Sequence, residues 1–215
     1  MNKRIFVVFW LLFTNSCLAD GLNDKLFNIE TKWEKIHYTY PVEQRAEAFS
    51  PLLKVATALV HEFPTRAEPL ILQATIMLAT AANEGPLSAL SSVKQARDLL
   101  FKAIAIDPAA KQGSAYVTLG VLYYKVPGWP IAFGDTEKAG ELLQMALQIS
   151  PDAVGGNYYY GDFLLTRGRI SEAAEYFNRA INAPASHYST LGNARLRAKA
   201  KHALEGITKL ASNRT

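Results

Sequence analysis

The side chains that most often carry chemistry are few and far apart in this chain of 215 residues. Two histidines that bind one metal ion from a helix usually lie one helical turn apart. The four histidines of this chain show no such spacing; they are His37, His61, His187 and His202. We find no phosphate-binding loop, no dinucleotide-binding glycine loop and no nucleophile elbow. The sequence therefore predicts no metal site, no cofactor and no catalytic residue.

Only one arrangement of residues would still allow this protein to be an enzyme. Asp135, Asp162 and His187 would have to meet in one cleft, with shifted pKa values, to act as a general acid and base. These residues are far apart in the sequence, so we expect a non-enzymatic protein unless the fold brings the three together.

Aromatic side chains give a stronger indication than titratable ones. Residues 123–135, YYKVPGWPIAFGD, place Trp129 and Phe133 beside two prolines, in a segment that interrupts the helical pattern. Loops are normally polar, so we expect both rings to fold back onto neighbouring helices, with Asp135 capping the next helix. A second interpretation stays open, in which the loop 126–134 also forms part of a binding pocket.

The elements that position these residues follow from two stretches with the same order of small and large side chains. Gly120, followed by Tyr123 and Ala139, is matched by Gly161 with Ala173 and a terminal proline. This order resembles that of the tetratricopeptide repeat. The resemblance implies antiparallel helix pairs, which can touch closely only where side chains are small. The expected helix-crossing residues are Gly120, Ala139, Gly161 and Ala173.

Helical periodicity extends this organisation along the chain. Apolar residues recur at spacings of three and four, prolines follow successive helices, and no segment alternates as a strand does. We predict an all-α fold class, a TPR-like superhelix with a C-terminal capping helix, in a single domain over residues 20–215. The expected bounds are about 22–64, 67–108, 113–151 and 155–184 for the helix pairs and 187–210 for the cap. Pro51 is expected to kink or divide the helix that contains it.

In tetratricopeptide repeats, the first helix of each pair lines a concave groove. On that register, Ile71, Thr75 and Leu78 of an earlier pair face the groove with residues of the two later pairs. The partner- or ligand-binding residues expected in the groove and the loop are Val117, Val121, Tyr124, Trp129, Phe133, Tyr158, Asp162 and Leu165. Such a groove is largely apolar, with an acid at one end, and favours an apolar or amphipathic partner surface.

The first 19 residues have the features of a signal peptide. Lys3 and Arg4 precede an apolar run over 5–13, and small or polar residues lead to Ala19. The run is too short to span a bilayer, which takes about 20 residues. We therefore expect export to the bacterial periplasm, with a lipoprotein anchored through Cys17 as the alternative; only lipidation would place the protein at a membrane.

Charge and cysteine content exclude two further classes. The net charge is +4, and half of it lies in the expected leader, so nucleic acid is not an expected partner. Cys17 is the only cysteine, so no disulfide can form within the chain.

The exported start, LGVLYYKVPGWPIAFGD at 119–135 and NYYYGDFL at 157–164 resemble the T component associated with tripartite ATP-independent periplasmic (TRAP) transporters. The likeness covers about residues 45–184. It implies a periplasmic repeat protein that docks a transporter's substrate-binding subunit, forms a trimer and offers a cleft to hydrophobic molecules.

Two functions are therefore expected as alternatives. The first is a non-catalytic adaptor that binds a periplasmic protein through its apolar concave groove. The second is a module for a small apolar molecule, enclosed by Tyr124, Trp129, Phe133 and Tyr158.

Overall fold

A computed structural model describes residues 4–82, 85–185 and 190–212, which form nine helices and no strand. In chain order the helices are α1 (Arg4–Thr39), α2 (Val42–Glu62), α3 (Ala67–Ala81), α4 (Pro86–Ile106), α5 (Ala110–Lys125), α6 (Thr136–Ile149), α7 (Val154–Thr166), α8 (Ile170–Asn182) and α9 (Thr190–Ser212). The predicted all-α fold class is confirmed. Residues 187–189 of the expected cap lie outside the described residues.

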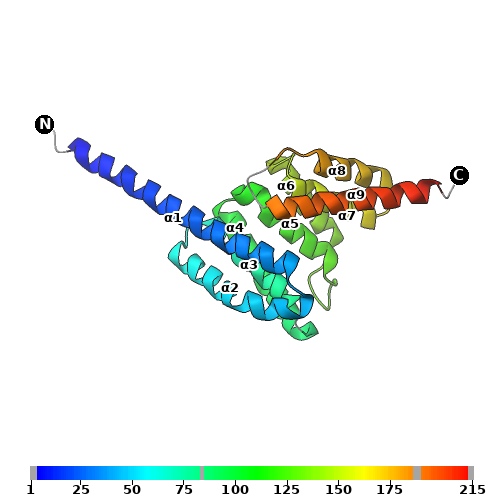
Figure 1. The fold of residues 1–215 in the computed structure, drawn as a ribbon, viewed down its shortest axis with the longest axis horizontal. Helices are drawn as coiled ribbons and strands as arrows, with labels where there is room; N and C mark the ends of the chain where they lie inside the picture. Colours follow the sequence, from blue (N-terminus) through cyan, green and yellow to red (C-terminus); the bar gives the residue numbers. More distant parts are fainter. Residues whose placement is uncertain (1–3, 83–84, 186–189, 213–215) are drawn as a thin grey trace.

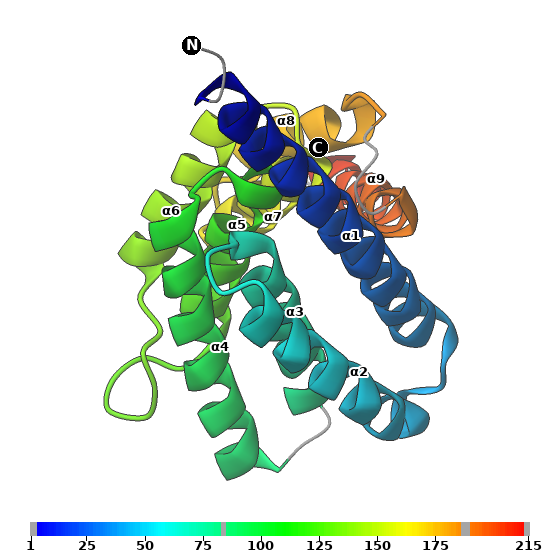
Figure 2. The same cartoon turned by 90° about the vertical axis from the view of Figure 1, so that its left-hand side faces the viewer.

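Successive helices pack as hairpins that stack on one another (Figure 1). The most extensive packing joins α3 to α4, α5 to α6 and α7 to α8. Helix α2 packs on α3, and α9 packs on α8 and α7 at the other end of the stack. Figure 2 shows α1 running across the face of the stack, and its N-terminal half extends beyond the other helices in Figure 1.

The α5–α6 pair makes its closest approach at a glycine. A Cβ atom at Gly120 would lie 2.6 Å from Cγ of Leu143 on α6 and 3.3 Å from the carbonyl oxygen of Ala139. Leu143 is fully buried, so it has no free space to move into. Gly120 and Ala139 therefore lie where the two backbones come together.

The α7–α8 pair repeats this arrangement. A Cβ atom at Gly161 would lie 2.9 Å from Cε1 of the buried Phe177 and 3.3 Å from the carbonyl oxygen of Ala173. Glycine on the first helix and alanine on the second thus set the spacing in both pairs.

The apolar core has three parts along the stack. One cluster joins α1, α2 and α3 around Phe49, a second joins α3, α4 and α5 around Leu119, and a third joins α6 to α9 around Phe177. Each cluster is shared between consecutive pairs, as expected for a repeat structure in which each unit packs on its neighbours.

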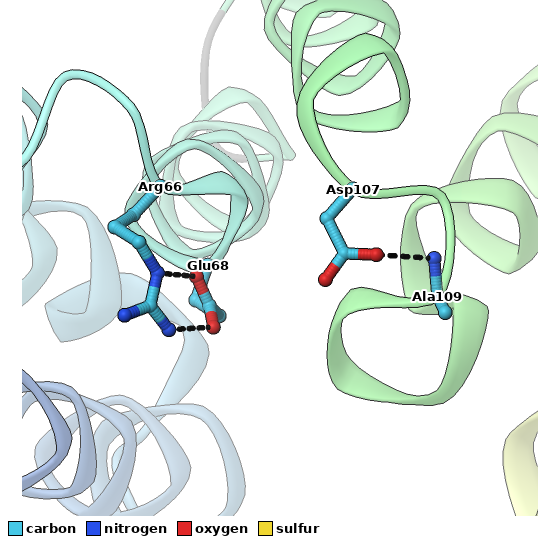
Figure 3. Close-up of polar contacts among 4 residues, drawn as sticks. All are labelled: Arg66, Glu68, Asp107 and Ala109. Atoms are coloured by element: carbon cyan, nitrogen blue, oxygen red, sulfur yellow. Dashed lines mark hydrogen bonds and ion pairs between the residues drawn. The ribbon is translucent and has the colours of Figure 1, made fainter. Parts of the chain in front are cut away.

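Polar contacts fix the connections between pairs (Figure 3). Before α3, the guanidinium of Arg66 donates two hydrogen bonds to the carboxylate of Glu68, at 3.2 and 2.5 Å. After α4, Oδ1 of Asp107 accepts a hydrogen bond of 2.9 Å from the backbone nitrogen of Ala109. This contact closes an Asx-type turn, which reverses the chain between α4 and α5.

A left-handed turn precedes the regular part of α5. Lys111, Gln112 and Gly113 have φ values of 49°, 59° and 73°. The side chain of Lys111 forms an ion pair with Glu30 of α1. This contact ties α1 to the start of α5, although the two residues are 81 positions apart in sequence.

The α6–α7 connection depends on a buried amide. Asn157 is fully buried, and its Nδ2 donates to the carbonyl oxygens of Pro151 at 2.6 Å and Ala153 at 2.9 Å. Its side chain therefore holds the start of α7 against the end of α6.

Helix α2 tests the division that was expected at Pro51 as the alternative to a kink. Pro51 does not divide this helix, because α2 continues from Val42 to Glu62. Pro51 and Glu47, whose carbonyl oxygen loses its helical donor, are both exposed, so water can hydrate that oxygen.

Candidate functional site

The concave side of the stack contains a cavity of about 410 Å³. Its floor is apolar and comes from the first helices of two pairs, with Leu78 of α3 and Val117 and Val121 of α5. Helices α1, α2, α7 and α9 supply the rest of its lining. This volume lies within the range of small-molecule sites, about 300–1,000 Å³.

One end of the cavity is aromatic. Trp33 and His37, one turn apart on α1, stack with ring centroids 4.9 Å apart and planes 12° apart. Tyr38 meets the His37 ring edge-on at 4.7 Å, and Tyr159 of α7 completes this end. These rings provide flat apolar surfaces with polar edges.

Three cationic side chains also line the cavity: Arg45 of α2, and Arg195 and Lys199 of α9. The guanidinium carbon of Arg195 lies 5.8 Å from the centroid of the Tyr38 ring. Arg45 Nε donates to the carbonyl oxygen of Tyr40 at 3.0 Å. None of the ion pairs between the described residues includes any of these three cations. No aspartate or glutamate lines this cavity in the described part of the chain.

The titratable groups at the aromatic end respond to burial and to these charges. Burial lowers the pKa of His37, and the positive charges of Arg45 and Lys199 lower it further. Burial also raises the pKa of Tyr38 to about 12, with Tyr159 and Glu34 adding to the rise and Arg195 opposing it. Helices α2 and α9 thus bring positive charge to bear on the rings of α1.

The structure places only part of the expected groove in this cavity. Val117 and Val121 line it, as do Thr75 and Leu78. Ile71, expected beside them, is buried in the core between α3 and its neighbours.

The residue of α7 that lines the cavity is not one of those expected there. Tyr159, and not Tyr158, lines the concave cavity. Tyr158 lines a neighbouring hollow against α9, which shares Arg195 and Lys199 with the cavity. Its ring packs on that of Phe177, with centroids 5.8 Å apart. Leu165 packs in the core of the last helices. Helix α9 lies against the face of α7 that was expected to line the groove, so the Tyr158 side of α7 is covered by it.

Tyr124 and Asp162 are tied to each other and do not line the concave cavity. The hydroxyl of Tyr124 donates to Oδ2 of Asp162 at 2.7 Å, and Nζ of Lys125 lies 3.0 Å from the same oxygen. Burial, the hydrogen bond and the charge of Asp162 all raise the pKa of Tyr124. The acid expected at one end of the groove therefore serves as a link between α5 and α7.

The loop between α5 and α6 also differs from the expectation. Trp129 does not fold back onto the helices, because its side chain is 89% exposed. Phe133 does pack, with its ring 5.2 Å from Tyr123 and 4.6 Å from the guanidinium carbon of Arg97. As expected, Asp135 caps α6, accepting a hydrogen bond of 3.0 Å from the backbone nitrogen of Lys138.

The four aromatic residues expected to enclose a small molecule are thus separated. Trp129 points into solvent, and Phe133 belongs to the core around α3 to α5. Tyr124 and Tyr158 belong to the core around α6 to α9. The exposed Trp129 leaves no enclosed pocket for these four rings to share.

Sequence reasoning missed the side chains that α1, α2 and α9 bring to the cavity. Trp33 and His37 are one turn apart on one face of α1, and Arg195 and Lys199 are one turn apart on α9. Each spacing places two side chains on one face of a helix, and this could have been recognised from the sequence. The basic residues of the last helix have the pattern of a solvent-exposed face. Nothing in the sequence shows that α9 turns back toward α1, so the sequence does not predict that Arg195 and Lys199 line the cavity.

The described residues do not show the catalytic arrangement of Asp135, Asp162 and His187 that the sequence left open. His187 lies outside the described residues, while Asp135 and Asp162 are engaged in the contacts above. Among the described residues, no group of three or more His, Cys, Asp and Glu side chains is arranged to hold a metal ion. Within the same part of the chain, no helix has the length and apolarity needed to cross a bilayer.

Comparisons with known proteins agree with this architecture. Residues 131–195 match the family model of the tetratricopeptide repeat. No curated protein matches the sequence. A crystal structure of a thermophilic TPR protein from Thermus thermophilus is similar at 19% identity and a TM-score of 0.57, covering 76% of this chain and 79% of that one.

Two crystal structures of MamA match more loosely. Both are 18% identical, with TM-scores of 0.35 and 0.34. The matches cover 73% and 72% of this chain, and 95% and 91% of the MamA chains. On the family match and the Thermus structure, the described chain has the all-α superhelical fold of tetratricopeptide repeat proteins.

Proposed function

We propose that this protein is an exported, non-catalytic adaptor that binds a periplasmic protein partner through the loop between α5 and α6. The tetratricopeptide repeat fold is typical of scaffolds for protein–protein interaction. The exposure of Trp129 is the observation that carries the proposal. Ile131, two residues further on, is 67% exposed, so two large apolar side chains of this loop are open to solvent.

The loop is held in place at its base. The backbone nitrogen of Gly134 donates to the carbonyl oxygen of Pro127 at 2.8 Å, and that of Asp135 donates to Tyr123 at 2.8 Å. A Cβ atom at Gly134 would lie 2.1 Å from the carbonyl oxygen of Val126, so this close approach requires glycine. The packed Phe133 anchors the same end of the loop.

A fixed loop that presents tryptophan is suited to protein recognition. Tryptophan is enriched among the residues that contribute most to binding at protein interfaces. A loop that is already ordered loses little conformational entropy on binding. The partner implied by the sequence resemblance is the substrate-binding subunit of a periplasmic transporter. The signal-peptide pattern of residues 1–19 supports the export that this proposal requires.

Trp129→Ser tests this proposal. The wild-type protein, isolated from the periplasmic fraction after cross-linking, is expected to carry a stoichiometric partner, which Trp129→Ser should lose. Leu87→Ser is the matched control, because Leu87 is 87% exposed at the start of α4 and lies outside the loop. Recovery of the protein alone, or equal recovery of the partner by both variants, contradicts the adaptor.

Export has its own measurement. The intact mass of the periplasmic protein should correspond to a chain without residues 1–19. A mass that includes a diacylglycerol on Cys17 would support the lipoprotein instead, and retention of the protein in the cytoplasm would contradict export.

A further inference from the structure

We propose that the concave cavity binds a single-chain amphiphile with a carboxylate head, the alkyl chain lying along α3 and α5 and the carboxylate among Arg45, Arg195 and Lys199. This site is separate from the Trp129 loop and does not depend on the adaptor function. It also differs in place and chemistry from the pocket of four aromatic residues expected from the sequence.

The walls of the cavity account for the alkyl chain. Leu78, Val117 and Val121 form an apolar strip, and Thr75 and Ala79 leave it smooth. The cavity is open on one side and has a volume of about 410 Å³, which suits a small molecule better than a folded protein segment. Each methylene that leaves water for this strip adds to the affinity.

The charges account for the carboxylate. Arg45 comes from α2, and Arg195 and Lys199 come from α9, so the three cations converge from two helices. None of them has an ion-pair partner among the described residues, and no carboxylate lines the cavity there. Positive charge beside an apolar wall attracts anions more strongly than it would in bulk water. Guanidinium groups suit the geometry of a carboxylate.

Two acids act on tyrosines of the cavity without lining it: Asp162 on Tyr159 and Glu34 on Tyr38, and both are already engaged. Oε1 of Glu34 accepts a hydrogen bond of 3.3 Å from the backbone nitrogen of Gly192, at the start of α9. Glu34 raises the pKa of Tyr38 but does not line the cavity. The positive side of the cavity is therefore available to an external anion.

The experiment is calorimetric titration of the full chain with dodecanoate, dodecanol and acetate. We expect dodecanoate to bind at least tenfold more tightly than dodecanol, and acetate to give no detectable binding. The affinity for dodecanoate should fall as sodium chloride is raised, because the head-group contacts are electrostatic. Equal binding of dodecanol and dodecanoate, or no binding of dodecanoate, overturns the proposal.

Two lysines on α9 provide a matched pair of variants. Lys199 lines the cavity, whereas Lys201, also exposed, does not. The double variant Arg195→Gln/Lys199→Gln should weaken dodecanoate binding at least tenfold, and Lys201→Gln should leave it unchanged. An equal loss in both variants contradicts the site.

Two further measurements keep the result interpretable. Circular dichroism checks that the variants are folded, and if the double variant is not, Val121→Phe, which fills the apolar strip, should abolish binding instead. Trp129→Ser should bind dodecanoate as the wild type does. Loss of the protein partner with retained dodecanoate binding would separate the two functions, and loss of both in Trp129→Ser would contradict separate sites.

Discussion

The hydroxyl of Tyr124 lies 2.7 Å from Oδ2 of Asp162 and joins the first helices of two consecutive pairs. Tyr124→Phe removes this hydrogen bond and leaves Asp162 with Lys125 as its partner. Because the acceptor is charged, we expect the free energy of unfolding to fall by about 1.5–3 kcal/mol. Urea denaturation measures the change.

Tyr116→Phe is the control for this bond. Tyr116 lies on α5 as well, and its hydroxyl makes no hydrogen bond with the described residues. The same loss of stability in both variants would show that the Tyr124 hydroxyl has no special role.

Alanine at the two helix crossings should be destabilising. At Gly120 the new Cβ meets a buried leucine at 2.6 Å, and at Gly161 it meets Phe177 at 2.9 Å. Overpacking of this kind costs about 1–3 kcal/mol, against a gain in helix propensity of up to about 1 kcal/mol. We expect thermal denaturation to show a net loss, larger for Gly120→Ala than for Gly161→Ala.

Gly155→Ala is the matched control on α7. The nearest atom to its new Cβ, Cδ1 of Leu196, is 4.0 Å away. This variant should be as stable as the wild type or more stable by up to about 1 kcal/mol. If Gly161→Ala behaves in the same way, the crossing is looser than described.

Asn157→Ala should weaken the junction between α6 and α7. It removes two hydrogen bonds from a fully buried side chain and leaves the carbonyl oxygen of Pro151 without that donor. The expected loss in the free energy of unfolding is about 1–3 kcal/mol, measured by urea denaturation. Asn182→Ala, which removes an exposed hydrogen bond of 3.0 Å to Asn178, should change stability by no more than about 0.5 kcal/mol.

His37 should make the fold sensitive to mild acid. Its pKa is lowered in the folded protein by burial and by Arg45 and Lys199, so the unfolded chain takes up a proton first as the pH falls. The stability associated with neutral His37 is therefore complete above about pH 6.5 and is lost as the pH falls toward the lower folded pKa.

The comparison is between the wild type and His37→Gln. Denaturant titrations from pH 8 to pH 5 should show a smaller loss of stability in the variant. Parallel curves for the two proteins would contradict the lowered pKa.

The sequence predicted those features that depend on local spacing. The order of Gly120, Tyr123 and Ala139 specifies which faces of consecutive helices meet, because a helix repeats every 3.6 residues. Val117 and Val121, one turn apart, could be assigned to one face of α5 for the same reason.

The features that depend on distant packing were not predictable in this way. Tyr158 and Tyr159 are neighbours in sequence, and Tyr159 lines the cavity because α9 covers the Tyr158 side of α7. The position of α9 depends in turn on the segment before it. The exposure of Trp129 depends on whether a surface exists for it to cover, and hairpin packing between α5 and its neighbours leaves none. Arg195 and Lys199 acquire a role only because α9 turns back toward α1.

That return of the last helix has a consequence for protein engineering. Repeat proteins usually accept an additional unit, since each unit contacts only those beside it. Here Gly192 of α9 contacts Glu34 of α1 across 158 positions of sequence. Inserting a further copy of the α7–α8 unit would carry α9 away from the N-terminal helices, so the length of the array cannot be varied without breaking this contact.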